Sequence, residues 1–497
     1  MGINASVFSG PTDLLAMGHP FCSVAYNETD GIPFGIDVRS GAIVYFDPWL
    51  LKNAGLINSA FGMLLGPKGH GKSATMKILA LRLMLIAAGN QTMRAAINDY
   101  KPEGSESEYG EVSRVTGSKV FKIANMNVNP FEADLYMTAT NSTYELGILG
   151  TSEAICEFAK GSDLRGHENT AHRIAIHTML QFDQNLWSPT LLFKILRSIS
   201  DTQIQSYFRN LDDKLQRQMT TRLKSIVDIS QQRTVEGQIE QLVHAKDNHK
   251  YEDIKAAADS VSTMLGDVLT GSYASMFGNE HSLYSMLTQR AVTKDWRGVE
   301  PEAETLMRIL DTRIKIAAIE NNRIDLLPHI EIDDEKHKSM DNLVYAKSHS
   351  FFSEIARGTH TCNLSATHRF DSVRRGGVGS ELYGLGETII NNLGFVMIGR
   401  QNDDPKILDE LQTRYNLSNA NTRILTELPN YTFGLKIGES EKMRFVRVFA
   451  TPNELAVMKT NASTDRMIAR PDVFSSEQIE KFAKENGIVY IGNDVKE

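Results

Sequence analysis

The chain has little cysteine and no pattern that would use it for cross-linking or for zinc. Only three cysteines occur in 497 residues, and they lie far apart without a CxxC pair. This spacing excludes a disulfide framework and a zinc site built on cysteine pairs. A chain of this kind fits a reducing compartment, so the sequence predicts a cytoplasmic protein.

Long hydrophobic runs and an excess of positive charge are also missing. The most apolar long stretch, residues 78–89, is interrupted by Arg82. It is well short of the roughly 20 residues needed to cross a bilayer, so we expect membrane association, at the inner face of the cell membrane, only through partners. The formal net charge of −8 argues against the uniformly basic surface of a dedicated duplex-DNA binder.

One motif with a defined chemistry is present. Residues 66–73 read GPKGHGKS, in which the glycines let backbone N–H groups turn inward toward phosphates. Lys72 supplies a cation to the β- and γ-phosphates of ATP, and the Ser73 hydroxyl can ligate Mg²⁺. An apolar run precedes the motif and an apolar helical pattern follows it, as a P-loop requires. We assign nucleotide binding to Gly66, Pro67, Lys68, Gly69, His70, Gly71, Lys72, Ser73 and Ala74.

The pattern of apolar residues predicts an α/β core that is interrupted by helices. Short apolar runs bounded by turn residues predict strands, and a periodic run predicts a helix over 72–88. The predicted strands are 43–46, 56–65, 95–99, 119–123, 326–333, 359–368, 394–400, 431–438 and 443–450. The runs 95–99 and 119–123 are expected to be buried parallel strands.

Between the two groups of strands the sequence is helical. Ile254, Ala258, Val261, Leu265 and Val268 fall on one face of a helix and predict the core of a helical bundle. We predict a parallel-sheet P-loop NTPase (RecA-like) core with an all-α insertion domain. The predicted boundaries are an N-terminal segment 1–30, core 31–137, insertion 138–288, core 289–460 and a C-terminal tail 461–497.

Two acidic residues are predicted to complete a hydrolytic site. The segment LLPHIEIDDEKHK places carboxylates at the end of an apolar run, where the carboxyl end of a strand lies beside a P-loop. Asp334 is the predicted Mg²⁺ ligand and Glu335 the predicted general base, with Asp333 the alternative in the register. His368 ends another predicted strand and is a candidate sensor of the γ-phosphate. A neighbouring subunit could contribute an arginine, for which Arg374, Arg375 and Arg400 are the candidates.

Further motifs follow one another in a recognisable order. They run from 31–47 through GPKGHGKS to INDYKPEGSESEYG (97–110), NVNPFEADL (127–135) and GSYASMFGNEHSL (271–283). This order resembles that of the conjugation ATPases of type IV secretion systems, the fourth VirB component and its TraC-like relatives, within the FtsK–HerA superfamily. The chain differs from the family in having IEIDDEKHK where an apolar run directly precedes Asp-Glu. It also has Thr367 and His368 where the family has Thr-Gln.

The resemblance implies an ATP-hydrolysing motor that energises a conjugative secretion channel. Its implied cofactors are ATP and Mg²⁺, and its implied partners are channel components and further copies of the chain, as a hexamer or a dimer. A hexameric DNA translocase of the HerA or FtsK kind, with DNA as partner, is one alternative. A scaffold that binds ATP and changes shape without turnover is another.

Overall fold

A single large sheet organises the protein. The computed structural model describes residues 31–90, 94–100, 102–103, 106–136, 144–200, 248–320, 329–334, 340–439, 442–451 and 454. The 11-stranded sheet runs, from edge to edge, through β2 (Ile43–Phe46), β1 (Ile32–Asp37), β13 (Met443–Val448), β12 (Thr432–Ile437), β11 (Phe395–Ile398), β3 (Gly62–Leu65), β10 (Thr361–Thr367), β9 (His329–Asp333), β4 (Arg94–Asp99), β8 (Ala291–Asp295) and β7 (Lys119–Lys122).

The strands from β11 to β7 are parallel to one another, and the other four extend the sheet in antiparallel pairs. This arrangement confirms the predicted α/β class with a mostly parallel sheet. Because the carboxyl ends of parallel strands meet at one edge, side chains that follow β3, β10 and β9 are brought close together. The strand order therefore decides which distant residues can form a site.

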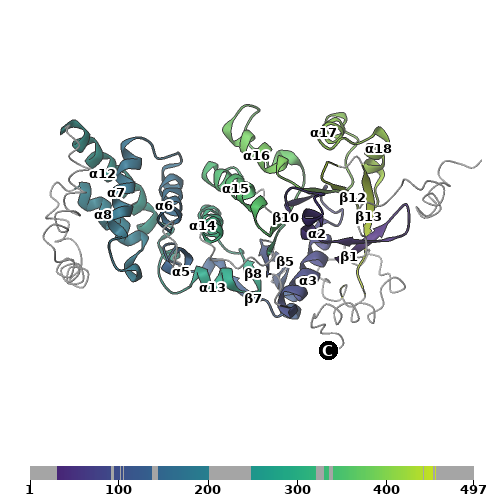
Figure 1. Cartoon of the computed structure of the whole chain (residues 1–497), viewed down its shortest axis with the longest axis horizontal. Coiled ribbons are helices and arrows are strands. Elements are labelled where there is room, and N and C mark those ends of the chain that lie inside the picture. Colours follow the sequence, from purple (N-terminus) through teal and green to yellow (C-terminus); the bar gives the residue numbers. More distant parts are fainter. Residues whose placement is uncertain are drawn as a thin grey trace, which may run out of the picture.

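Helices cover both faces of the sheet (Figure 1). One face carries α2 (Pro48–Asn53), α3 (Lys72–Asn90) and α4 (Gly110–Thr116), and Leu64, Ile332 and Leu364 pack there with α3. The opposite face carries α14 (Pro301–Glu320), α15 (Leu343–Ile355) and α16 (Glu381–Asn391), and Met63 and Val396 pack there. The remaining short elements are β5 (Pro102–Glu103), β6 (Glu106–Ser107), α5 (Ala133–Tyr136), α13 (Leu283–Thr288), α17 (Pro405–Tyr415) and α18 (Asn419–Glu427).

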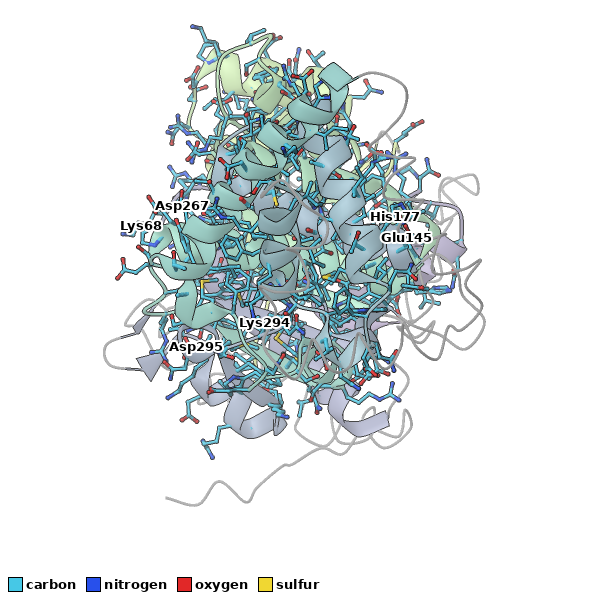
Figure 2. All side chains as sticks on the ribbon, turned by 90° about the vertical axis from the view of Figure 1, so that its left-hand side faces the viewer. Lys68, Glu145, His177, Asp267, Lys294 and Asp295 are labelled. Carbon is cyan, nitrogen blue, oxygen red and sulfur yellow. The ribbon has the colours of Figure 1, made fainter. Side chains whose placement is uncertain are left out.

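Four helices gather at the end of the molecule away from the antiparallel strands (Figure 1). They are α6 (Tyr144–Lys160), α7 (His167–Met179), α8 (Pro189–Ser200) and α12 (Asn248–Thr270). The predicted stripe on α12 is confirmed, because all five of its apolar residues are buried in the core that these helices share. At the surface, Glu145 of α6 and His177 of α7 also pair, with 2.6 Å between oxygen and nitrogen (Figure 2).

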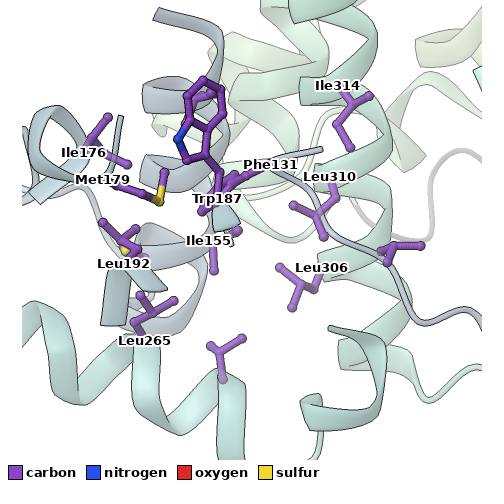
Figure 3. Packing of buried hydrophobic residues seen from close by; sticks show 14 of the residues in the cluster. Phe131, Ile155, Ile176, Met179, Trp187, Leu192, Leu265, Leu306, Leu310 and Ile314 are labelled. Atoms are coloured by element: carbon purple, nitrogen blue, oxygen red, sulfur yellow. The ribbon is translucent and has the colours of Figure 1, made fainter. Parts of the chain in front are cut away.

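The core of the four helices is continuous with that of the sheet. Leu306, Leu310 and Ile314 of α14 belong to the same buried cluster as Ile155 of α6 and Leu265 of α12 (Figure 3). Helix α14 also packs against α15. It therefore connects the four helices to the layer that covers the sheet.

A buried ionic cluster attaches α14 to β9. The Lys315 ammonium lies 2.5 Å from Asp311 and 2.6 Å from Glu331 of β9, and Lys294 of β8 lies 2.7 Å from Asp311. Burial alone would lower the pKa of Lys315, but the two carboxylates raise it above its ordinary value. The lysines in turn hold the pKa of Glu331 well below its usual range, against the effect of burial. The strand that ends in Asp333 is thus fixed to the helix that contacts α6.

Replacing Lys315 by methionine should reduce the free energy of unfolding by about 3–5 kcal/mol, because it leaves Glu331 and Asp311 buried with less positive charge. Urea unfolding of the full chain measures the change. Arg197→Met is the control, since it breaks the exposed pair with Asp259 and should cost less than about 1 kcal/mol. Equal costs for the two variants would contradict a structural role for the cluster.

Two predicted strands differ from the structure, and one interior strand was not predicted. Only the last four residues of 56–65 form β3, and 119–123 forms an edge strand whose side chains are mostly exposed rather than buried. The interior strand β8 was not predicted, because its sequence AVTKD contains two charged residues. They are tolerated inside the fold because Lys294 pairs with Asp311, and Asp295 with Arg297.

The segments 1–30 and 461–497 lie outside the described residues, and the predicted domain boundaries stay predictions. Among the helices that the structure describes, none combines the length and the apolarity needed to cross a bilayer.

Candidate functional site

The phosphate-binding loop joins the buried strand β3 to the first turn of α3. Gly69 and Gly71 both have φ of +88°, in the left-handed region that favours glycine. At Gly71 a Cβ atom would also lie 2.2 Å from the ring of Tyr431. Two glycines of the motif are therefore required by backbone conformation, and one of them by packing as well.

Lys72 is held across the mouth of this loop. Its side chain is 8% exposed, and its ammonium donates to the Pro67 carbonyl at 3.0 Å and lies 3.1 Å from Nδ1 of His368. The same His368 nitrogen also lies 3.4 Å from the Gly66 carbonyl, so the imidazole contacts both the lysine and the start of the loop. The structure thus brings together two residues that the sequence analysis had singled out separately.

Strand order explains this meeting. β10 lies beside β3 and is parallel to it, with Thr367 opposite Leu65. The residues that follow these two, His368 and Gly66, are therefore neighbours at the same end of the sheet. The Gly66 N–H donates to the Thr367 carbonyl at 3.3 Å and extends the pairing into the loop. On the other side of β3, the Gly399 N–H donates to the Leu65 carbonyl at 2.7 Å. The start of the loop is therefore fixed by both neighbouring strands.

The acidic residues leave the next strand, β9, on opposite faces of the sheet. Ile330 and Ile332 pack on the α3 face, whereas Glu331 contacts α14, so alternation directs Asp333 toward α14 and α15 and Asp334 toward α3. Both are buried, with 5% and 6% exposure. Glu335, the predicted general base, lies outside the described residues.

The surroundings of Asp333 agree with this orientation. Burial lowers the pKa of Arg308, a buried guanidinium on α14, but the negative charge of Asp333 acts in the opposite direction, and the pKa of Arg308 lies above its ordinary value. Burial and then Asp333 also raise the pKa of Tyr345 on α15. Arg308 further lies 3.9 Å above the ring of Tyr100. Asp333 is thus part of the polar interior beneath α14 and α15.

Asp334 instead faces groups that line α3. Burial, followed by the charges of Asp334, Glu108 and Asp99, raises the pKa of Tyr109 well above its ordinary value. Lys77 of α3 lies 3.7 Å from Glu108, and the Tyr109 N–H donates to Asp99 at 3.2 Å. The sequence analysis did not single out Lys77. A lysine within the apolar helix that follows the loop was the signal that could have identified it.

Two of the three candidate arginines have partners in their own subunit. Arg374 pairs with Asp371, Glu387 and Glu410, and Arg375 lies 3.2 Å from Asp341. Arg400 is exposed. Burial and then the charges of Arg400 and Lys72 lower the pKa of His70, which places Arg400 near the loop. Arg400 is the candidate whose position leaves it available to a nucleotide.

The loop fits a nucleotide with Mg²⁺. Gly69 and Gly71 add no side chain of their own to the loop, Lys72 lies at its mouth, and Ser73 is in the first turn of α3. Asp334 is on the same face of the sheet as α3. These are the donors that a phosphate chain and a hard cation require.

Neither a protein-family model nor a curated protein matches the sequence. Among solved structures, VirB4 of Thermoanaerobacter pseudethanolicus is similar, with 16% identity and a TM-score of 0.56 over 86% of this chain and 99% of that one. The bacterial conjugative coupling protein TrwB is also matched, with 13% identity and a TM-score of 0.46 over 78% of this chain and 84% of that one. At this identity the likeness to VirB4 concerns the fold, and it shows that the chain has the P-loop NTPase fold of VirB4.

Proposed function

We propose that the chain is a P-loop ATPase of the VirB4 kind that energises a type IV secretion or conjugative DNA-transfer apparatus. The observation that carries the proposal is the placement of Lys72 at the mouth of the loop, in contact with His368 from the adjacent strand. The fold likeness that spans 99% of the VirB4 chain supports the choice of system. The motif order resembling conjugation ATPases supports it independently.

In this mechanism the loop binds ATP through its inward N–H groups, and Lys72 pairs with the β- and γ-phosphates. Ser73 and Asp334 would hold Mg²⁺, which neutralises phosphate charge when bound. The contacts of Lys72 with Pro67 and His368 fix its ammonium before the nucleotide arrives. This preorganisation lowers the cost of orienting the cation during the reaction.

Hydrolysis then requires a water molecule positioned in line with the bond to be broken. The water oxygen bonds to the γ-phosphorus, the bond to the β,γ-bridging oxygen breaks, and its electron pair stays on ADP. Glu335 would accept the proton of the water. His368, by holding Lys72, is a positioning residue for this step. In a homo-oligomer, hexameric or dimeric, an arginine of a neighbouring copy would stabilise the transferred charge, whereas Arg400 would act at the loop of its own chain.

The channel partners follow from the proposed system, and membrane association would occur through them at the inner face. A measurement of ATP hydrolysis by the purified chain, with and without single- and double-stranded DNA and alongside its oligomeric mass, tests the proposal. We expect Mg²⁺-dependent turnover that DNA changes by less than about twofold. Stimulation of tenfold or more in a hexamer would instead indicate a DNA translocase, and ATP binding without turnover would indicate a scaffold.

A further inference from the structure

A second cavity opens beside the phosphate-binding loop. It has a volume of about 230 Å³. Its lining residues come from the start of the loop, the end of β10 and the segment after β11, and are Pro67, Lys68, His368, Arg369, Gln401, Asn402 and Ile407. We call it the side pocket. It is smaller than the roughly 300–1,000 Å³ of pockets that hold drug-sized ligands, which favours a small occupant.

The side pocket adjoins the γ-phosphate end of the nucleotide site. The Lys72 ammonium, which a P-loop directs to the β- and γ-phosphates, contacts Pro67 and His368. Both of these residues line the side pocket. The side pocket therefore adjoins the place where a loop of this kind would hold the γ-phosphate.

The charge of the side pocket suits an anion. Lys68 and Arg369 are exposed, and within the described part of the chain neither forms an ion pair (Figure 2 labels Lys68). Arg374, five residues beyond Arg369, is by contrast surrounded by carboxylates. In a chain with net charge −8, two such cations on one small cavity favour an anion as its occupant.

Amide groups complete the lining, and one of them is fixed in place. The Gln401 N–H donates to the Leu425 carbonyl at 2.9 Å, and the Gln401 side chain donates to the Gly399 carbonyl at 3.0 Å. Asn402 follows it at the rim of the pocket. Amide donors and a guanidinium together are suited to the several acceptor oxygens of a phosphate ion.

We propose that the side pocket receives the inorganic phosphate formed by hydrolysis and holds it, through Arg369 and Lys68, before it leaves the protein. The inference rests on the proposed ATPase function and extends it to product release. The occupant is inorganic phosphate, which near neutral pH is a mixture of the singly and the doubly charged anion. No additional reactant is required, because the ion is the second product of the reaction.

The test compares inhibition of ATP hydrolysis by inorganic phosphate in the full chain, in Arg369→Gln and in Arg423→Gln. Arg423 is an exposed arginine of α18 that does not line the side pocket, so Arg423→Gln is a charge-matched control. We expect the phosphate inhibition constant to rise about tenfold in Arg369→Gln, as for loss of one charge-assisted hydrogen bond, with KM for ATP changed less than about twofold. The control should resemble the wild type.

Equal inhibition in the two variants would overturn the proposal, as would a parallel tenfold loss of ATP affinity in Arg369→Gln. Calorimetric titration of the ADP-loaded chain with inorganic phosphate separates this result from failure of the ATPase proposal, because it needs no turnover. Binding weakened by Arg369→Gln supports the side pocket even if hydrolysis is not observed. Binding of an acidic peptide without binding of phosphate would instead indicate a protein-docking site and contradict the proposal.

Discussion

Replacing Lys72 by alanine should lower kcat for ATP hydrolysis by about 1,000-fold, comparable to the loss of a preorganised donor in other enzymes. The residue is buried at 8% exposure, and its ammonium lies where the loop directs β- and γ-phosphates. The truncation removes the positive charge and also the contact that holds His368. A coupled assay of ADP formation at saturating ATP and Mg²⁺ measures the loss.

His368→Ala is the comparison that separates loss of the Lys72 charge from loss of the contact that positions Lys72. We expect it to reduce kcat by only about tenfold, because Lys72 keeps its bond to the Pro67 carbonyl at 3.0 Å. Far-ultraviolet circular dichroism and the midpoint of urea unfolding establish that both variants are folded. A Lys72→Ala protein that turns over within tenfold of the wild type would place the ATPase site elsewhere.

The local part of the site could be predicted from the sequence. Glycines at positions 69 and 71, an apolar run before them and an apolar helix after them leave few alternatives to a phosphate-binding loop. The structure adds the reason for each glycine, in the φ of +88° at both and in the Tyr431 ring against Gly71. That ring comes from a loop far along the chain, and no local pattern indicated it.

The non-local part could be predicted only as separate candidates. His368 and Lys72 are 296 positions apart in the sequence and 3.1 Å apart in the structure. Their contact depends on β10 lying beside β3, whereas β4, the next strand after α3 in the chain, lies three places away in the sheet. Apolar runs identify strands but do not determine their order, so the sequence analysis could not place His368 at the lysine.

Buried charge accounts for the main failures. The strand β8 was missed because AVTKD does not read as an interior strand, yet Lys294 is 2% exposed. Its partner Asp311 is on α14, which follows β8 in the chain, and its other neighbour Glu331 is on β9. Prediction from sequence treats each charged residue as unfavourable in an interior strand, whereas in the fold the opposite charges of the cluster offset the cost of burying one another. For the same reason the sequence could not show which of the three candidate arginines have acidic partners in the fold.

The structure adds most to the proposed mechanism by indicating which of Asp333 and Asp334 faces the helix that follows the phosphate-binding loop. Asp334→Asn should lower kcat about 100-fold or more and shift the Mg²⁺ dependence of hydrolysis to higher concentration. The reason is that Asp334 leaves β9 toward α3, the helix that begins with Lys72 and Ser73. ATPase rates measured across a Mg²⁺ titration report both effects. Glu335→Gln, in contrast, should bind ATP with Mg²⁺ normally and turn over slowly.

Asp333→Asn is the matched variant, one residue away and on the opposite face. It should retain kcat within about tenfold but lower the free energy of unfolding by about 3 kcal/mol, because Arg308 is then buried with less negative charge nearby. Urea unfolding and the same Mg²⁺ titration distinguish the two outcomes. If Asp333→Asn shifts the Mg²⁺ dependence while Asp334→Asn only destabilises the fold, alternation along β9 does not determine the metal ligand. The strand would then have to rotate when nucleotide binds, and the buried pairs of Glu331 with Lys294 and Lys315 would be the contacts that such a rotation must break.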